Sequence, residues 1–193
     1  MEEVKKSNTS FAVAGLCGAF LFAVVWLVAG MADGAWAFSE DLFCDLGLSY
    51  DSVASNLFQY GLILTGLLLA YLGIGKVLRE KKVNCVAGVF TFVAGLSLVV
   101  LGGFIVDDNA NIHETAIYLV MIFTFLAAAL SAYGDFTNGK NLSGAASVVV
   151  TLGIIAACVS GSLAFIESWT MLLLMIWMFT ESLKMAFLAP AKN

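Results

Sequence analysis

The sequence predicts an all-α protein, an integral membrane bundle of six transmembrane helices with both termini in the cytoplasm. The prediction that the protein is an integral membrane protein rests on composition. Hydrophobic residues make up 61% of the 193 residues and charged residues only 12%, whereas soluble domains are about a quarter charged. So few charged side chains cannot cover a water-facing globule. The chain is therefore expected to reside in a bilayer, as a multi-pass protein of the cell membrane.

Six apolar runs are each long enough to cross the hydrocarbon core, which takes about 20 helical residues. The expected spans are 11–31, 55–75, 83–106, 115–133, 142–165 and 169–188, and a loop over 32–54 lies outside the membrane. The runs are continuously apolar, unlike transmembrane β-strands. The first run is longer than the apolar part of a signal peptide, and we interpret it as a retained helix. The whole chain, 1–193, is expected to form one domain.

The basic residues predict the orientation, because loops on the cytoplasmic side carry an excess of Lys and Arg. With the N-terminus inside and the spans alternating, all nine basic residues fall inside: Lys5, Lys6, Lys76, Arg79, Lys81, Lys82, Lys140, Lys184 and Lys192. Most of the fourteen acids fall outside, and the net charge is −5. An acidic chain argues against nucleic acid as a partner, since nucleic acid requires a basic face.

Polar side chains gather at the outer ends of the early spans. Asp45 lies in the first outer loop, and His113, the only histidine, opens the fourth span. We predict His113 as a general base oriented by Asp45, with a solvated imidazole at a helix start as the alternative. The candidate ligand-binding residues are Asn56, Gln59 and Tyr60, which share one helix face by their i, i+3, i+4 spacing, and Tyr118.

A cation site is a further possibility in the second outer loop. Asp107, Asp108 and Glu114 supply oxygen ligands of the kind that Ca²⁺ or Mg²⁺ prefers. A lone histidine disfavours zinc. The spacing matches no EF-hand, and solvated loop acids are the alternative. The sequence by itself requires no cofactor.

Ionisable residues within the spans are scarce. Glu181 precedes Lys184 by three residues near the inner end of the last span, and a local ion pair or snorkelling explains both. Asp135 and Glu167 lie at span edges. No series of carboxylates crosses the bilayer midplane, which argues against a proton-coupled transporter.

Small residues indicate where helices approach one another. Gly88, Gly95 and Gly102 recur every seven residues on the third span, so they form a stripe against which another backbone can pack closely. That partner is a helix of the same chain or of a second copy, so a homo-oligomer is an open prediction. The four cysteines share no convenient outer location, and we expect no disulfide.

Two stretches resemble a prokaryotic six-helix membrane family catalogued as domain of unknown function number 998. The stretch DLFCDLGLSYDSVASNLFQYG carries Cys44-Asp45-Leu46-Gly47, where the family tends to show Ser-Asp-Leu-Gly, and Asn56 at the start of the second span. The stretch VDDNANIHETAIYL resembles the family's acidic loop and histidine-led fourth span, with the histidine at His113. The resemblance implies a compact six-helix bundle and supports roles for Asp45, Asn56 and His113. It implies no activity.

Three functions remain open at this point. The first is a protein that binds or acts on a membrane lipid or another amphiphile, with a polar pocket at the outer headgroup level. The second is a transporter or channel. The third is a structural or assembly subunit of a membrane complex.

Overall fold

The computed structural model describes residues 2–187, without the side chains of residues 2–8, 106–108 and 160. Six long helices account for most of it, and the described residues contain no strand: α1 (Glu2–Asp33), α2 (Ser52–Arg79), α3 (Val83–Gly103), α4 (Val106–Thr137), α5 (Asn141–Ser160) and α6 (Leu163–Phe187). A short 3₁₀ helix, η1 (Phe43–Leu48), lies in the loop between α1 and α2. All six long helices are long and apolar enough to cross a membrane, so the predicted all-α bundle of six membrane-spanning helices is confirmed, while the cytoplasmic placement of the termini stays a prediction.

Two of the breaks between helices lie elsewhere than predicted. The fifth and sixth spans were expected to break after Phe165, but the chain breaks at Gly161, whose backbone is extended, and Ser162 then accepts a hydrogen bond from the Phe165 amide at 3.3 Å. Hydropathy missed this break because the flanking residues are apolar. α4 begins at Val106 rather than near Thr115, and a non-helical Asn109 interrupts its first turns.

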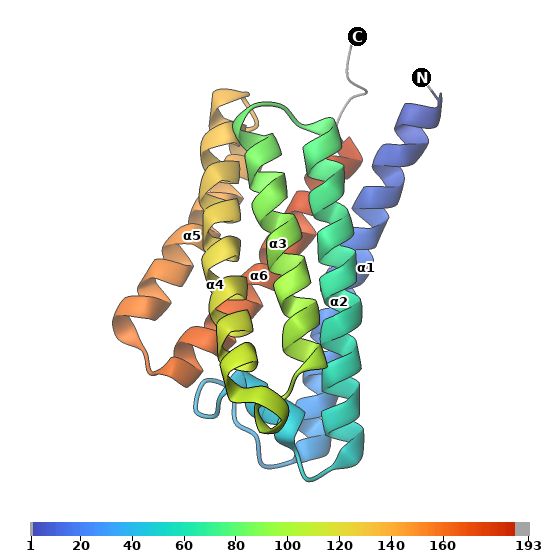
Figure 1. Ribbon diagram of the computed structural model, residues 1–193. Coiled ribbons are helices and arrows are strands. Elements are labelled where there is room, and N and C mark those ends of the chain that lie inside the picture. Colours follow the sequence, from blue (N-terminus) through green and yellow to red (C-terminus); the bar gives the residue numbers. More distant parts are fainter. Residues whose placement is uncertain (1, 188–193) are drawn as a thin grey trace.

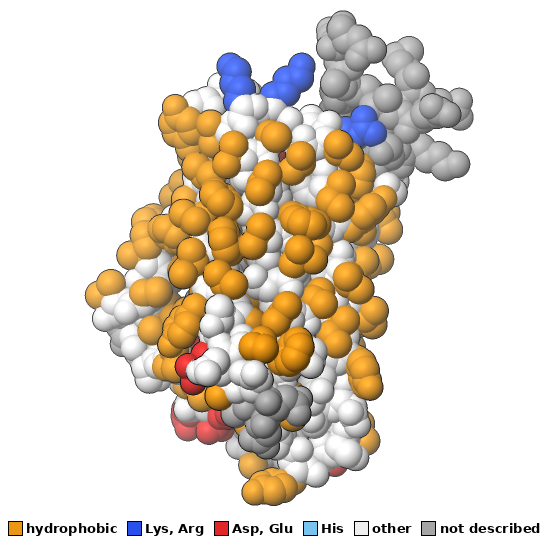
Figure 2. All heavy atoms as spheres, viewed as in Figure 1, with side chains coloured by type: hydrophobic (Ala, Val, Ile, Leu, Met, Phe, Trp, Pro, Cys, Tyr) orange, Lys and Arg blue, Asp and Glu red, His pale blue; other side chains and the backbone are white. Residues whose placement is uncertain are grey.

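The charges separate the two ends of the bundle. We call one end the basic end, where the α2–α3 and α4–α5 connections lie (Figure 1). Its described basic residues are Lys76, Arg79, Lys81, Lys82, Lys140 and Lys184. The opposite, acidic end carries η1 and the α3–α4 and α5–α6 connections. Figure 2 shows basic side chains at one end, acidic ones at the other and a wide apolar belt between them, as expected for a spanning bundle.

The predicted glycine stripe of α3 packs against α2 of the same chain. A Cβ atom at Gly95 would lie 2.5 Å from the Ala70 backbone nitrogen, and one at Gly102 would lie 2.6 Å from the Gln59 carbonyl oxygen. Gly88 has a similar approach to Val77, at 2.8 Å. Only residues without a Cβ permit such contact between backbones. The stripe is thus occupied within the chain, and oligomerisation through it remains an untested prediction.

The loop between α1 and α2 folds over the acidic end of the bundle. Phe43 and Leu46 of η1 are fully buried, and the Phe43 ring packs on Phe58 of α2 with ring centroids 4.8 Å apart. Asp51 caps α2 by accepting hydrogen bonds from the amides of Val53 and Ala54 at 2.8 and 2.9 Å. The loop is therefore an ordered cover, and its shape determines the site described next.

Candidate functional site

An acidic depression lies at the acidic end, between the end of α1 and the covering loop. It has a volume of about 600 Å³, and its lining includes the carboxylates of Asp33, Asp41 and Asp45, with Ser49. Asp45 is the predicted site residue that the structure places here. The depression is lined by residues of one loop and one helix end, so its shape depends on how the loop folds.

Each aspartate also holds the loop in place. Asp33 accepts hydrogen bonds from the amides of Ala35 and Trp36 at 3.2 and 2.7 Å. Asp41 accepts from the Ala37 amide at 2.8 Å and Asp45 from the Leu42 amide at 3.2 Å, each through Oδ2. The Oδ1 atoms of Asp41 and Asp45 are not used in these bonds and are free to accept from a ligand donor.

Electrostatics distinguish Asp45 from an ordinary surface aspartate. Partial burial raises the pKa of its carboxyl, and the nearby charge of Asp41 acts in the same direction. The hydrogen bond from the Leu42 amide and the charge of His113 pull the pKa back down. The ionised carboxylate of Asp45 is therefore stabilised by a ligand that brings a hydrogen-bond donor or a positive charge.

His113 is buried inside the bundle near its acidic end and does not line the depression. It is 5% exposed, and its Nδ1 lies 2.7 Å from the carbonyl oxygen of Phe104, so Nδ1 carries the proton and donates. Its Nε2 is buried with no hydrogen-bond partner among the described residues. The structure therefore brings His113 into the electrostatic range of Asp45 but does not bring it into the acidic depression.

The other predicted ligand-binding residues do not converge on the depression. Gln59 turns inward, and its Nε2 donates to the Gly47 carbonyl oxygen at 3.2 Å and to Ser55 Oγ at 3.0 Å, so it fixes the end of η1. Asn56, Tyr60 and Tyr118 are exposed. Asn56, Gln59 and Tyr60 were predicted to share one helix face, but that face is wide enough for Gln59 to point inward while Asn56 and Tyr60 are exposed.

The predicted cation ligands lie only partly within the described residues. Among them, no group of three or more His, Cys, Asp or Glu side chains is arranged to hold a metal ion. Glu114 is exposed. The side chains of Asp107 and Asp108, the other two predicted ligands, lie outside the described residues.

An apolar groove adjoins the acidic depression. It has a volume of about 550 Å³ and lies between α1 and α6, where it is lined by Trp26, Leu27, Met31, Phe38, Leu172 and Met175. Trp36 lines both hollows, and its ring centroid lies 6.1 Å from that of Trp26. The polar and the apolar hollow thus share Trp36 as a lining residue.

Glu167 at the start of α6 is a residue whose role sequence reasoning missed. It is 2% exposed, and its Oε2 accepts hydrogen bonds from the Phe43 amide at 3.1 Å and from the Cys44 thiol at 3.7 Å. A carboxylate at a span edge looks solvated in the sequence. In the structure it fastens η1 to α6 and so keeps the covering loop on the bundle.

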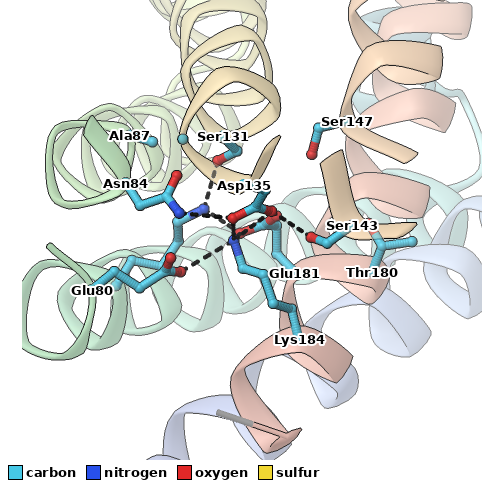
Figure 3. A network of polar contacts seen from close by, with 12 residues as sticks. Glu80, Asn84, Ala87, Ser131, Asp135, Ser143, Ser147, Thr180, Glu181 and Lys184 are labelled. Carbon is cyan, nitrogen blue, oxygen red and sulfur yellow. Dashed lines mark hydrogen bonds and ion pairs between the residues drawn. The ribbon is translucent and has the colours of Figure 1, made fainter. Parts of the chain in front are cut away.

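A second polar cluster, at the basic end, was not foreseen (Figure 3). It joins buried charged side chains from α2, α4 and α6 and from the α2–α3 connection, with Lys184 at its centre. The Nζ atom of Lys184 lies 2.7 Å from Glu181, 3.1 Å from Asp135 and 3.2 Å from Glu80. Lys76 bonds to Glu181 and, at 2.8 Å, to Ser131. The predicted Glu181–Lys184 ion pair is confirmed, but it is one contact of a larger network.

This cluster acts as a clamp between the helix ends. Asp135 also accepts from Asn84 Nδ2 at 2.7 Å and from Ser143 Oγ at 2.5 Å, so α3 and α5 join the network. Buried charges are tolerated where each has a partner of opposite sign and additional hydrogen bonds. Members of the network such as Lys76 and Asp135 lie far apart in the sequence. The sequence could not predict their meeting without knowledge of which helices are neighbours.

Fold and charge distribution together define the class: a polytopic membrane protein built as a six-helix bundle with an ordered cover at its acidic end. The profile of the family described as "Protein of unknown function (DUF998)" matches residues 16–183. The chain belongs to this family, as the resemblance implied. No curated protein and no solved structure matches the chain.

Proposed function

We propose that the protein binds an amphiphile drawn from the leaflet at its acidic end. The head of the ligand occupies the acidic depression and its tail lies in the apolar groove between α1 and α6. The observation that carries the proposal is the position of Trp36, which lines both hollows. A ligand that fills both must be polar at one end and apolar at the other, which is the chemistry of a membrane lipid.

The charge of the depression selects the head. Its lining residues include Asp33, Asp41 and Asp45 but no Lys or Arg. An anionic phosphate head would meet carboxylates of the same sign, whereas hydroxyl or amine groups supply the donors that carboxylates accept. The favoured ligand is therefore an uncharged or amine-bearing amphiphile.

The proposal concerns binding rather than turnover, because the predicted general base does not line the depression. His113 uses Nδ1 to hold the Phe104 carbonyl oxygen. We assign it the role of holding the α3–α4 connection in place under the loop.

The test compares two probes that differ only in a phosphate group. Purified full-length protein in phosphatidylcholine nanodiscs is titrated with tritiated 1-oleoylglycerol and with its 3-phosphate. We expect saturable binding of 1-oleoylglycerol, at least about tenfold tighter than that of the phosphate. Absence of saturable binding, or tighter binding of the phosphate, would overturn the proposal.

A charge variant tests the assignment of the head site. In the Asp41→Asn, Asp45→Asn double variant the amide oxygens retain the loop hydrogen bonds while the two negative charges are lost. Discrimination against the phosphate probe should fall about threefold or more. Glu40→Gln is the matched control, because Glu40 is exposed in the same loop and does not line the depression; its discrimination should equal that of the wild type.

A further inference from the structure

Resting on the proposed function, we infer that the ligand is an acyl amphiphile, and that its ester or amide carbonyl oxygen accepts a hydrogen bond from the indole N–H of Trp26. The carbonyl separates a hydroxyl- or amine-bearing head in the acidic depression from a chain in the groove.

The inference begins with an unpaired donor. Trp26 lines the apolar groove and is only 7% exposed, yet its Nε1–H is buried with no acceptor among the described residues. Two other indoles are satisfied within the chain: Trp36 donates to the Leu42 carbonyl oxygen at 3.0 Å and Trp177 to Ser147 Oγ at 3.2 Å. Buried indole N–H groups usually find a partner, so the Trp26 N–H is a donor that the described residues leave unused.

Trp169 supplies a second donor of the same kind nearby. Its Nε1–H is also buried without an acceptor among the residues described. Trp26 and Trp169 both pack on Phe38, each with ring centroids 5.6 Å from it. A carbonyl oxygen has two lone pairs and is able to accept from two donors.

The two donors lie at a similar depth. Trp26 comes seven residues before the end of α1 at Asp33, and Trp169 six residues after the start of α6 at Leu163. At 1.5 Å per residue both are about 10 Å from the acidic end. An unpaired N–H buried among apolar side chains of a membrane-spanning bundle is costly. An acceptor has to arrive with the ligand.

Several acceptors are able to bind an indole N–H, and the surroundings favour a carbonyl. A charged acceptor is disfavoured because the neighbouring lining residues Leu27, Met31 and Leu172 are apolar. An ester or amide carbonyl is uncharged, is a good acceptor, and directly precedes the hydrocarbon chain of an acyl lipid. Trp36, whose ring neighbours that of Trp26, also lines the depression that contains Asp45.

The experiment uses 1-oleoylglycerol and its ether analogue 1-O-oleylglycerol, which lacks the carbonyl. Full-length protein in phosphatidylcholine nanodiscs should bind the ester about fivefold tighter than the ether, as one added hydrogen bond allows. Trp26→Phe keeps an aromatic ring and removes the N–H. In this variant the ester should weaken about fivefold while the ether is unchanged, so that the preference disappears.

Trp177→Phe is the control, because Trp177 donates within the chain and lies outside the groove; it should keep the fivefold preference. Trp169→Phe is measured in parallel, so that a failure of Trp26→Phe to fold leaves a second variant, in which the preference should also fall. Equal binding of both probes by the wild type, or an unchanged preference in folded Trp26→Phe, overturns the inference while leaving the proposed function in place. Absence of saturable binding of either probe overturns both.

Discussion

The Nζ atom of Lys184 on α6 lies 3.1 Å from the Oδ2 atom of Asp135 on α4, and both side chains are almost fully buried. The pair joins two helices that have few other contacts with each other. Together with Glu80, Glu181 and Lys76 it fixes the relative positions of the helix ends at the basic end. At the acidic end the helices are instead held by a covering loop and by packed aromatic rings.

Removing the carboxylate of Asp135 should destabilise the bundle. Asp135→Asn leaves Lys184 with less compensation in a buried site, and we expect a loss of about 2–4 kcal/mol, measured as a lower thermal unfolding temperature in detergent. Lys140→Gln is the control, because Lys140 is 31% exposed and 3.7 Å from Glu80; surface pairs of this kind contribute about 1 kcal/mol or less. Equal effects of the two variants would contradict the clamp.

Replacing a glycine of α3 at its contact with α2 should push the two helices apart. In Gly95→Ala the new Cβ would lie 2.5 Å from a backbone nitrogen that cannot move aside, and overpacking of this kind costs about 1–3 kcal/mol. Gly103→Ala is the matched control at the end of the same helix, where nothing lies within 4 Å of the new Cβ. Thermal unfolding measures both, and a melting temperature for Gly95→Ala equal to that of Gly103→Ala would show that the approach is not tight.

The thiol of Cys44 should react slowly with maleimides. Burial raises its pKa, and the negative charge of Glu167 adds to the effect, so the reactive thiolate is scarce near neutral pH. In a variant that retains only Cys44, labelling at pH 8 should be at least about tenfold slower than in denatured protein, and it should still accelerate as the pH rises above 9.

Glu167→Ala tests the contact that restrains this thiol. The variant removes the acceptor for the Phe43 amide and Cys44, and it should increase the labelling rate of Cys44 severalfold by loosening η1. Glu40→Ala, an exposed acid of the same loop, should leave the rate unchanged. Fast labelling of Cys44 in the parent protein would mean that the loop does not cover it.

The predicted orientation of the bundle in the membrane is tested separately. If the basic end faces the cytoplasm, an impermeant amine reagent added to whole cells should spare the exposed Lys81 and Lys82, and should modify them after permeabilisation. Lys76 should stay unmodified in both cases, because it is 0% exposed. Labelling of Lys81 or Lys82 in intact cells would invert the topology and place the acidic depression inside.

Local features of the sequence determined the helices, the separation of charge and the face of α3 that another helix approaches closely. Runs of apolar residues predict spans because lipid leaves no other partner for the backbone, and the heptad spacing of Gly88, Gly95 and Gly102 predicted a close approach. These properties depend on residues close together in the chain.

The tertiary structure alone decided which polar groups meet. Lys76 and Glu181 are neighbours only because α2 and α6 end side by side, and Asp45 reaches the acidic depression only because Glu167 holds η1 in place. The same folding left Tyr60 and Tyr118 exposed and the indole of Trp26 without an acceptor. Hydropathy reports whether a residue tolerates lipid, whereas the pairing of two distant polar groups depends on the rotation and order of the helices that carry them.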